Sequence, residues 1–221
     1  WTQGGGSLGS AVFGGAIVNG AGAHFTDEGA LASNNYKELR RDAVGGGGTF
    51  TNLGTYTRSG LGTTRAYGFD NRGLLAIEAA TVRVHAAFRN TGTVYLATGS
   101  TLLANDGSLA NAGQLTGTGT VQVVNLFRIL NNTGMIDPGL ATERGTLTID
   151  GRLQMAGDGT LHIDLAQGQN DLLAITSDAT FGGTLQIAAT PGAALQLGDS
   201  FVVTTYGQRL AESTFANVQW L

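Results

Sequence analysis

Between residues 50 and 136, the hydrophobic and polar positions follow one seven-residue pattern that occurs five times. It reads large apolar residue, any residue, Asn, any residue, Gly, any residue, apolar residue. The asparagines of successive copies recur at an almost constant spacing of about 20 residues, and self-similarity at such a period is typical of a solenoid, in which each repeat packs on its neighbours. The repeated polar positions are Asn52, Asn71, Asn90, Asn111 and Asn132, with Gly54, Gly73, Gly92, Gly113 and Gly134.

The residues around each copy predict short strands. Runs such as 93–96 and 120–123 are rich in β-branched residues and are bounded by Gly, Asn or Ser. Such runs lie too close together to leave room for crossover helices, so the fold is an antiparallel sandwich or a parallel β-helix. The constant period favours the second. We therefore predict an all-β fold, a parallel β-helix with coils of about 19–21 residues that stack at about 4.8 Å.

This geometry assigns a structural role to each position of the pattern. The large apolar residues are expected to stack inside the coils as two continuous rows. The Asn suits a tight turn, and stacked asparagines could form a ladder of amides. The Gly is predicted to supply a positive φ. The first row comprises Phe50, Phe69, Phe88, Leu109 and Leu130, and the second Tyr56, Leu75, Val94, Leu115 and Ile136.

The chain outside the repeat divides into two further parts of one continuous solenoid. Residues 1–49 are predicted to form irregular coils, with a charged excursion near 27–42 that is either a short helix or a plain loop. Residues 137–221 alternate polar and apolar positions, as expected for longer strands with one face in the core. A local function is expected where a regular rod is interrupted. The basic residues of the excursion, Lys37, Arg40 and Arg41, are therefore the predicted interaction region.

Composition excludes several classes of protein. Gly accounts for 36 of 221 residues but without the strict period of collagen, and 42% hydrophobic residues exclude a disordered chain. The net charge of −4 argues against binding to nucleic acid or an anionic membrane. The absence of cysteine excludes disulfides and thiolate metal sites. No apolar run is long enough for a transmembrane helix, so we expect no direct membrane insertion. The start at Trp1 without Met is expected for a processed form or a fragment.

Candidate catalytic groups are sparse and scattered. An enzyme on a β-helix would place carboxylates with Arg or Lys on one outer sheet. The spacings between Asp137, Asp150 and Asp164 are well short of one coil, so these residues are not assigned to one face. Solvated or turn positions are predicted for the acidic residues. The sequence thus predicts no catalytic residue.

Metal and nucleophile motifs are also weak. His24, His85 and His162 have no second His or Cys at metal-ligand spacing, and glycine-rich calcium repeats are absent from the sequence. Residues 5–9 match Gly-x-Ser-x-Gly, but no strand precedes the match, and a chance match is the preferred interpretation in so glycine-rich a chain. We therefore predict no metal and no cofactor.

A modest basic bias in the middle coils raises one binding hypothesis. Arginines with nearby tyrosines on an exposed sheet could bind an acidic polysaccharide, although solvated surface charge is the preferred interpretation. The residues concerned are Arg65, Arg72, Arg83 and Arg89, with Tyr56, Tyr67 and Tyr95.

The order of motifs in the last part of the chain resembles a known family. Gly-Met-Ile-Asp-Pro-Gly at 134–139 is followed by Gly-Thr-Leu-Thr-Ile-Asp-Gly at 145–151, Gly-Thr-Leu-His-Ile-Asp-Leu at 159–165 and Phe-Gly-Gly-Thr-Leu at 181–185. This order is similar to the C-terminal stem of bacterial autotransporter passenger domains and related large surface adhesins, over about residues 50–218. The resemblance implies a right-handed parallel β-helix that a Gram-negative bacterium exports and displays at, or sheds from, its surface.

Three functions follow as hypotheses. The first is a non-enzymatic extracellular adhesin, stalk or surface-display scaffold that binds a surface glycan or protein through many weak contacts. The second is a self-assembling extracellular filament or matrix protein, because the open ends of a β-helix are unpaired edges. The third is a polysaccharide-active β-helix enzyme.

Overall fold

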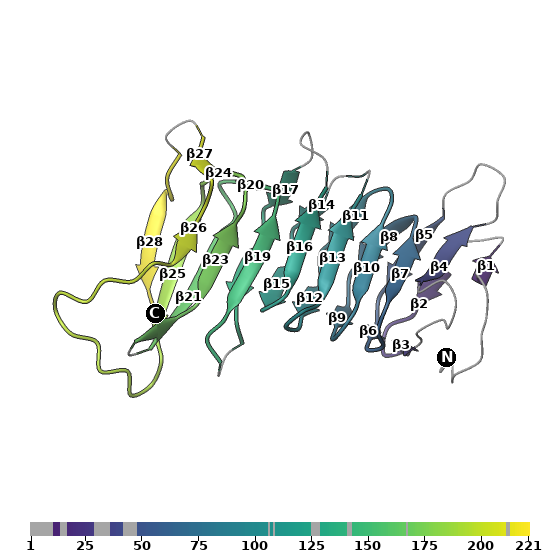
Figure 1. Cartoon of the computed structure of the whole chain (residues 1–221), viewed down its shortest axis with the longest axis horizontal. Coiled ribbons are helices and arrows are strands. Elements are labelled where there is room, and N and C mark those ends of the chain that lie inside the picture. The colour runs from purple at the N-terminus through teal and green to yellow at the C-terminus, as the bar shows by residue number, and fades with distance from the viewer. Residues whose placement is uncertain are drawn as a thin grey trace.

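The computed structural model describes the backbone of residues 11–13, 17–28, 36–41, 48–105, 107, 109–124, 129–140, 143–166, 168–210 and 213–221. These residues form a parallel β-helix, in which three sheets run along the molecule and the chain visits them in turn (Figure 1). The predicted fold class is confirmed. None of the described residues belongs to a helix, so no membrane-spanning helix is found among them.

Sheet 1 contains the first strand of each coil. In order it comprises β1 (Ala11–Phe13), β4 (Tyr36–Arg41), β7 (Thr63–Ala66), β10 (Thr81–Val84), β13 (Thr101–Ala104), β16 (Thr120–Val123), β19 (Thr146–Asp150), β23 (Leu172–Ile175) and β26 (Thr204–Thr205).

Sheet 2 contains the second strand of each coil. It comprises β2 (Ile17–Asn19), β5 (Thr49–Asn52), β8 (Gly68–Asn71), β11 (Phe88–Asn90), β14 (Leu109–Asn111), β17 (Ile129–Asn132), β20 (Arg152–Met155), β24 (Asp178–Thr180) and β27 (Gln208–Arg209).

Sheet 3 contains the third strand. It comprises β3 (His24–Asp27), β6 (Thr55–Arg58), β9 (Leu74–Ile77), β12 (Thr93–Leu96), β15 (Gln114–Gly117), β18 (Met135–Pro138), β21 (Thr160–Ala166), β25 (Thr184–Ala189) and β28 (Asn217–Trp220). A short strand, β22 (Gln169–Asn170), pairs antiparallel with β21.

One corner of the coil has a constant length, and the other two absorb the change of period. Within the repeat, the corner from sheet 2 to sheet 3 always has two residues between the Asn that ends one strand and the first residue of the next. The corner from sheet 1 to sheet 2 grows from one residue between β7 and β8 to five between β16 and β17. The asparagines therefore stay in register, although their separation rises from 19 residues before Asn90 to 21 residues after it.

The core includes the two predicted rows of apolar side chains, together with inward residues of sheet 1 such as Val82, Leu102 and Val121. In the first row, Phe50, Phe69 and Phe88 are adjacent in the sheet 2 register, and their ring centroids lie 5.0 and 5.7 Å apart. The second row, which includes Tyr56 and Leu75, follows the sheet 3 register. All ten predicted core residues are at most 2% exposed, so both rows are confirmed. Burial of such side chains from coil to coil is the main stabilising term of a solenoid.

The charged excursion predicted for residues 27–42 is partly a regular strand. Tyr36–Arg41 form β4, which pairs in parallel with β1 and β7, and so are neither the helix nor the loop that the charge pattern indicated. The composition of the segment was misleading because its neighbours in the sheet, and not its own propensities, select the strand. Residues 29–35 and 42 of the predicted excursion lie outside the described part of the chain.

Candidate functional site

The most regular geometry of the repeat lies in a column of buried asparagine amides. Each Nδ2 donates to the Oδ1 of the asparagine in the next coil, at 2.7 Å for every step from Asn19 to Asn111 and at 2.6 Å from Asn111 to Asn132. Most of these amides also donate to a backbone carbonyl in the following coil, such as Leu74 O at 2.9 Å from Asn52. Asn19 extends the column by one member beyond the five-copy repeat. The amides therefore satisfy one another inside the fold and are not a row of ligand-binding groups.

The glycines of the repeat form a second column, for a reason other than the one predicted. None of the five has a positive φ, so the prediction of a left-handed turn residue is wrong. A Cβ on Gly92 would instead lie 2.1 Å from the carbonyl oxygen of Gly73, and a Cβ on Gly113 would lie 2.1 Å from that of Gly92. Stacked corners bring backbone against backbone, and only glycine leaves room for this contact.

The basic residues Lys37, Arg40 and Arg41 lie in β4 and hence within sheet 1. The register pairs Lys37 with Thr64, which is buried, and pairs Arg40 and Arg41 with residues of β1. The structure does not describe their side chains, and their role as an interaction region stays a prediction.

A buried ion pair interrupts the apolar interior near the N-terminal end. Arg58 is fully buried, and its Nε lies 3.6 Å from Oδ2 of Asp27, which is 4% exposed. The hydroxyls of Tyr56 and Thr64 also donate to this carboxylate oxygen. Burial, followed by the negative charge of Asp27, raises the pKa of Tyr56 well above its ordinary value. This polar cluster is internally paired, and no sequence pattern indicated it, since Asp27 and Arg58 are 31 residues apart.

The structure brings a second charged group together on the outer side of sheet 3. Arg144 Nη1 lies 2.7 Å from Asp164 Oδ2 and 3.9 Å from Asp171 Oδ2, and His162 Nε2 lies 3.5 Å from Asp164 Oδ1. Asp137 belongs to the adjacent strand β18, one coil earlier, where Gln114 donates to it at 3.0 Å. We call these residues the Arg144 network: Gln114, Asp137, Arg144, His162, Asp164 and Asp171.

This arrangement corrects the expectation that the acidic residues are scattered. Asp137 and Asp164 lie in the paired strands β18 and β21 of sheet 3, whereas Asp150 lies in β19 of sheet 1. The sequence separation of Asp137 and Asp164 did not predict this proximity because the chain between these two residues departs from the regular coil. It includes an antiparallel bridge between Leu140 and Glu143. The prediction of a solvated or turn position is also wrong for Asp171, which is fully buried.

The buried carboxyl of Asp171 is held by backbone donors. Gly145 N–H donates to Oδ1 at 2.9 Å and Asp164 N–H donates to Oδ2 at 3.0 Å. Burial raises the pKa of Asp171 to about 6, although the two N–H donors and Arg144 favour the charged form. Burial likewise raises the pKa of Asp137, against the opposing effects of His162 and Gln114. Two carboxyls of the Arg144 network are therefore destabilised in their charged forms.

This shift predicts an unusual dependence of stability on pH. A carboxyl whose pKa is higher in the folded state binds more protons when folded, so its contribution to stability falls as pH rises from about 4 through about 6. Lowering the pH from 7 to 5 should stabilise the wild-type chain relative to Asp171→Asn by about 1 kcal/mol. Urea unfolding of both chains at pH 5, 6 and 7 measures this difference. A constant difference across the three pH values would contradict the prediction.

A cavity of about 580 Å³ lies beside the Arg144 network and is lined by Glu143, Arg144, Gln169 and Thr190, among others. Arg144 is only 7% exposed, and its Nη2 donates to Thr190 Oγ1 at 3.3 Å. The guanidinium therefore joins the loop before β19, strand β21 and the segment after β25. Arg144 is engaged in ion pairs with Asp164 and Asp171, so its role is structural. His162 and Asp137 are therefore the members of the network that are more available to a ligand.

The arginines and tyrosines of the hypothetical polysaccharide surface do not converge. Tyr56 is fully buried in the core and cannot contact a ligand, which is a correction to its inclusion. Arg72 is paired with Asp70 at 2.7 Å, and Arg83 donates to Asn105. Arg65 and Arg83 are register neighbours in sheet 1, whereas Tyr95 lies in sheet 3.

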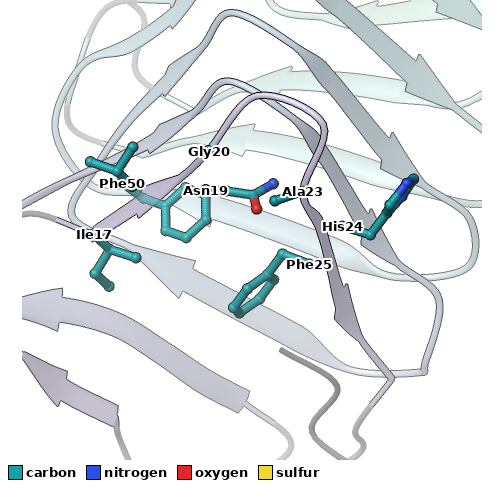
Figure 2. Close-up of a pocket in the computed structure, with 8 residues that line it drawn as sticks. Ile17, Asn19, Gly20, Ala23, His24, Phe25 and Phe50 are labelled. Atoms are coloured by element: carbon teal, nitrogen blue, oxygen red, sulfur yellow. The ribbon is translucent and has the colours of Figure 1, made fainter.

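A smaller cavity of about 280 Å³ opens at the N-terminal end of the helix, on the inner side of β2 and β3. Figure 2 shows Asn19 and the aromatic rings of Phe50 and Phe25 around this cavity, with Ile17 completing the apolar wall. His24 lies at the rim and is exposed. The cavity thus lies at this end of the two apolar rows and of the amide column.

Comparisons with known proteins give no further guide: no family model, no curated protein and no solved structure matches this chain. Within the described part of the chain, no group of three or more His, Asp and Glu could hold a metal ion. The Gly-x-Ser-x-Gly match at residues 5–9 lies outside the described residues.

Proposed function

We propose that this chain is a rigid scaffold of an exported bacterial surface protein, acting as adhesin, stalk or display rod. The observation that carries the proposal is the unbroken stack of coils, in which the repeated polar groups bind one another and not a ligand. The nine coils of the described residues, at about 4.8 Å each, give a rod of about 40 Å. A rod of this kind sets the distance between an anchor and a contact surface.

The same construction explains how weak binding could become useful. Each coil contacts only its neighbours, so the outward positions can vary without disturbing the ladders inside. Repeated weak contacts with a surface glycan or protein then add through a high effective concentration. The resemblance to autotransporter stems supports an extracellular location, and the absence of cysteine is compatible with it.

The proposal is tested by comparing the binding of the free monomer with that of many copies displayed on one bead. We expect beads that carry many copies to bind a glycan array or bacterial and host cell surfaces at least about 100-fold more strongly than the free monomer. A matched set of beads should carry a chain with Lys37, Arg40 and Arg41 each changed to Gln, which tests the predicted interaction region. Binding by neither the beads nor the monomer to any of these surfaces would contradict an adhesive role.

A second candidate is a polysaccharide-active enzyme, favoured by the Arg144 network and its adjoining cavity. His162 and Asp137 lie on the outer face of a parallel sheet, and Arg144 of the same network lines an open volume large enough for a sugar residue. Acidic polysaccharides would be incubated with the chain and assayed for reducing ends or unsaturated products. Product formation that His162→Gln abolishes, and that Gln186→Ala on the neighbouring strand retains, would replace the scaffold proposal.

A self-assembling filament is the third candidate and rests on the last described coil. Val218, Trp220 and Leu221 are 58%, 67% and 69% exposed, and among the described strands β28 pairs only with β25. Exposed apolar groups on an unpaired edge favour association. Negative-stain microscopy of the purified chain distinguishes filaments from single rods.

A further inference from the structure

Three successive coils after the repeat have enlarged corners between sheet 3 and sheet 1. Within the repeat, from β6 to β16, only two to four residues connect the strands at this corner. After the repeat, seven residues separate β18 from β19, and fourteen separate β25 from β26. The corner between them, after β21, contains the short antiparallel strand β22. Loops carried by a rigid scaffold are the usual location of binding residues.

The three enlarged corners meet around the cavity of about 580 Å³. Glu143 and Arg144 come from the first corner, and residues 190–193 come from the third. Ala166, at the end of β21, and Gln169, in β22, come from the coil between them. The volume lies within the range of about 300–1,000 Å³ that is typical of ligand sites. Three segments that are distant in the sequence thus form one recess.

Hydrogen bonds hold the three corners together. Gly145 N–H donates to Oδ1 of Asp171 at 2.9 Å, which joins the first corner to the second. The N–H and the hydroxyl of Thr190 donate to Leu165 O at 2.9 and 2.6 Å, which joins the third corner to β21. Arg144 Nη2 donates to Thr190 Oγ1 at 3.3 Å and so joins the first corner to the third. The recess is therefore formed before any ligand arrives, as is usual for ligand sites.

Two polar side chains of the cavity have no hydrogen bond or ion pair with any described residue. They are the carboxylate of Glu143 and the carboxamide of Gln169, and both residues are exposed. The position of Glu143 is fixed by two backbone hydrogen bonds with Leu140, at 2.8 and 3.0 Å. The guanidinium of Arg144, by contrast, is already engaged in ion pairs. A ligand in the cavity therefore meets one available carboxylate and one available carboxamide.

We propose that this cavity binds a sugar residue of a neutral glycan. The two oxygens of the Glu143 carboxylate accept hydrogen bonds from two neighbouring ring hydroxyls, and the carboxamide of Gln169 donates to a further sugar oxygen. The short side chains of Ala166 and Ala193 leave room for the ring and contact its C–H groups. The inference rests on the proposed adhesive function, and it adds one specific site to the weak contacts along the rod.

The charges around the cavity favour a neutral sugar over an acidic one. Asp164 and Asp171 share the positive charge of Arg144, and Glu143 adds a carboxylate that is paired with no cation in the described part of the chain. A carboxylate on the sugar would increase this excess of negative charge, and like charges oppose association. The acidic polysaccharide considered for the arginines of the middle coils is therefore not the expected ligand of this cavity.

The test uses the full chain, with alanine methyl groups labelled for NMR, and methyl glycosides of galactose, glucose and galacturonic acid. At least one of the two neutral sugars should shift the signals of Ala166 and Ala193 in a saturable manner. The signal of Ala104, which is fully buried in the repeat, should not move. The galacturonic acid glycoside carries a carboxylate where galactose has a hydroxymethyl group, and it should bind at least about fivefold more weakly than the galactoside.

Substitutions at the two available groups test their roles. Glu143→Gln keeps the shape of the side chain but removes a charged acceptor, so the affinity for the neutral sugar should fall about tenfold. Gln169→Ala removes a neutral hydrogen bond and should lower the affinity about fivefold. Glu78→Gln is the matched control, because Glu78 is exposed in the corresponding corner of a regular coil, outside the cavity, and its replacement should leave the affinity unchanged.

The proposed sugar site is overturned by any of three results: no shift of Ala166 or Ala193 up to the solubility limit of the sugars, equal affinities of the wild-type chain and Glu143→Gln, or tighter binding of the acidic sugar than of the galactoside. The bead assay separates such a failure from failure of the adhesive function. Beads that still bind a surface would retain the adhesive function without this site, whereas beads that bind nothing, with no NMR shift, would overturn both.

Discussion

Asn111→Asp should destabilise the folded chain by about 4 kcal/mol at pH 7, the largest loss we expect from a change of so few atoms. Asn111 is 2% exposed, and its Nδ2 donates to Asn132 Oδ1 at 2.6 Å and to Met135 O at 3.1 Å. In the variant, a carboxylate oxygen replaces this nitrogen and faces only the acceptor oxygens of Asn132 and Met135. The site is closed to water, so no donor compensates the buried negative charge. Urea unfolding followed by circular dichroism measures the loss.

The pH dependence of that variant tests the same cause. Burial beside acceptors raises the pKa of the new carboxyl above that of the unfolded chain, so the loss should shrink as the pH is lowered through the raised value. Asn131→Asp is the matched control, because it makes the same chemical change at the exposed neighbour of Asn132 and should alter stability by less than about 0.5 kcal/mol. Equal stabilities for the two variants would show that the amide column contributes little.

Gly113→Ala should destabilise the chain by about 3 kcal/mol, the expected upper range for an added methyl group in a closed space. The added Cβ would lie 2.1 Å from the carbonyl oxygen of Gly92 and 2.7 Å from the carbonyl carbon of Thr91, so two stacked corners must separate. The free energy of unfolding in urea measures the effect. Separation of the corners should also weaken the column bond from Asn90 to Asn111.

Gly157→Ala separates this clash from the general effect of replacing glycine. A Cβ at position 157 meets no atom within 4 Å, and this glycine is not among those with a positive φ. Its replacement should change stability by less than about 0.5 kcal/mol, and any change should favour folding because alanine restricts the unfolded chain. A loss for Gly113→Ala within about 1 kcal/mol of that for Gly157→Ala would refute backbone contact as the reason for glycine in the repeat.

The core and the amide column could be predicted from the sequence because both depend only on the period. When coils stack in register, residues one period apart must become neighbours, so the row of Phe50, Phe69 and Phe88 can be read directly from the spacing. The role of glycine could not be read in this way. A positive φ and a close backbone contact both demand glycine, and only the three-dimensional structure distinguishes them.

The contacts of the Arg144 network could not be predicted from the period of the repeat. Asp137 and Asp164 are separated in sequence by more than one regular coil and less than two, because the excursion near residue 140 and the longer strand β21 shift the count. Arg144 reaches them from outside the strands, through a loop whose path depends on packing. Asp27 and Arg58 are register partners in sheet 3, but their pairing could not be read from the repeat because Asp27 lies before its first copy.

The sequence alone thus determined the all-β solenoid, its coil length and its two rows of apolar side chains. It could do so because residues one period apart in a repeated pattern become neighbours when the coils stack. The tertiary structure alone decided which charged groups meet, that residues 36–41 form a strand, and that Asn19 joins the amide column. These features arise where the repeat is broken or ends. There the position of a residue depends on the path of particular loops and on the coil beside it, and no local pattern records either.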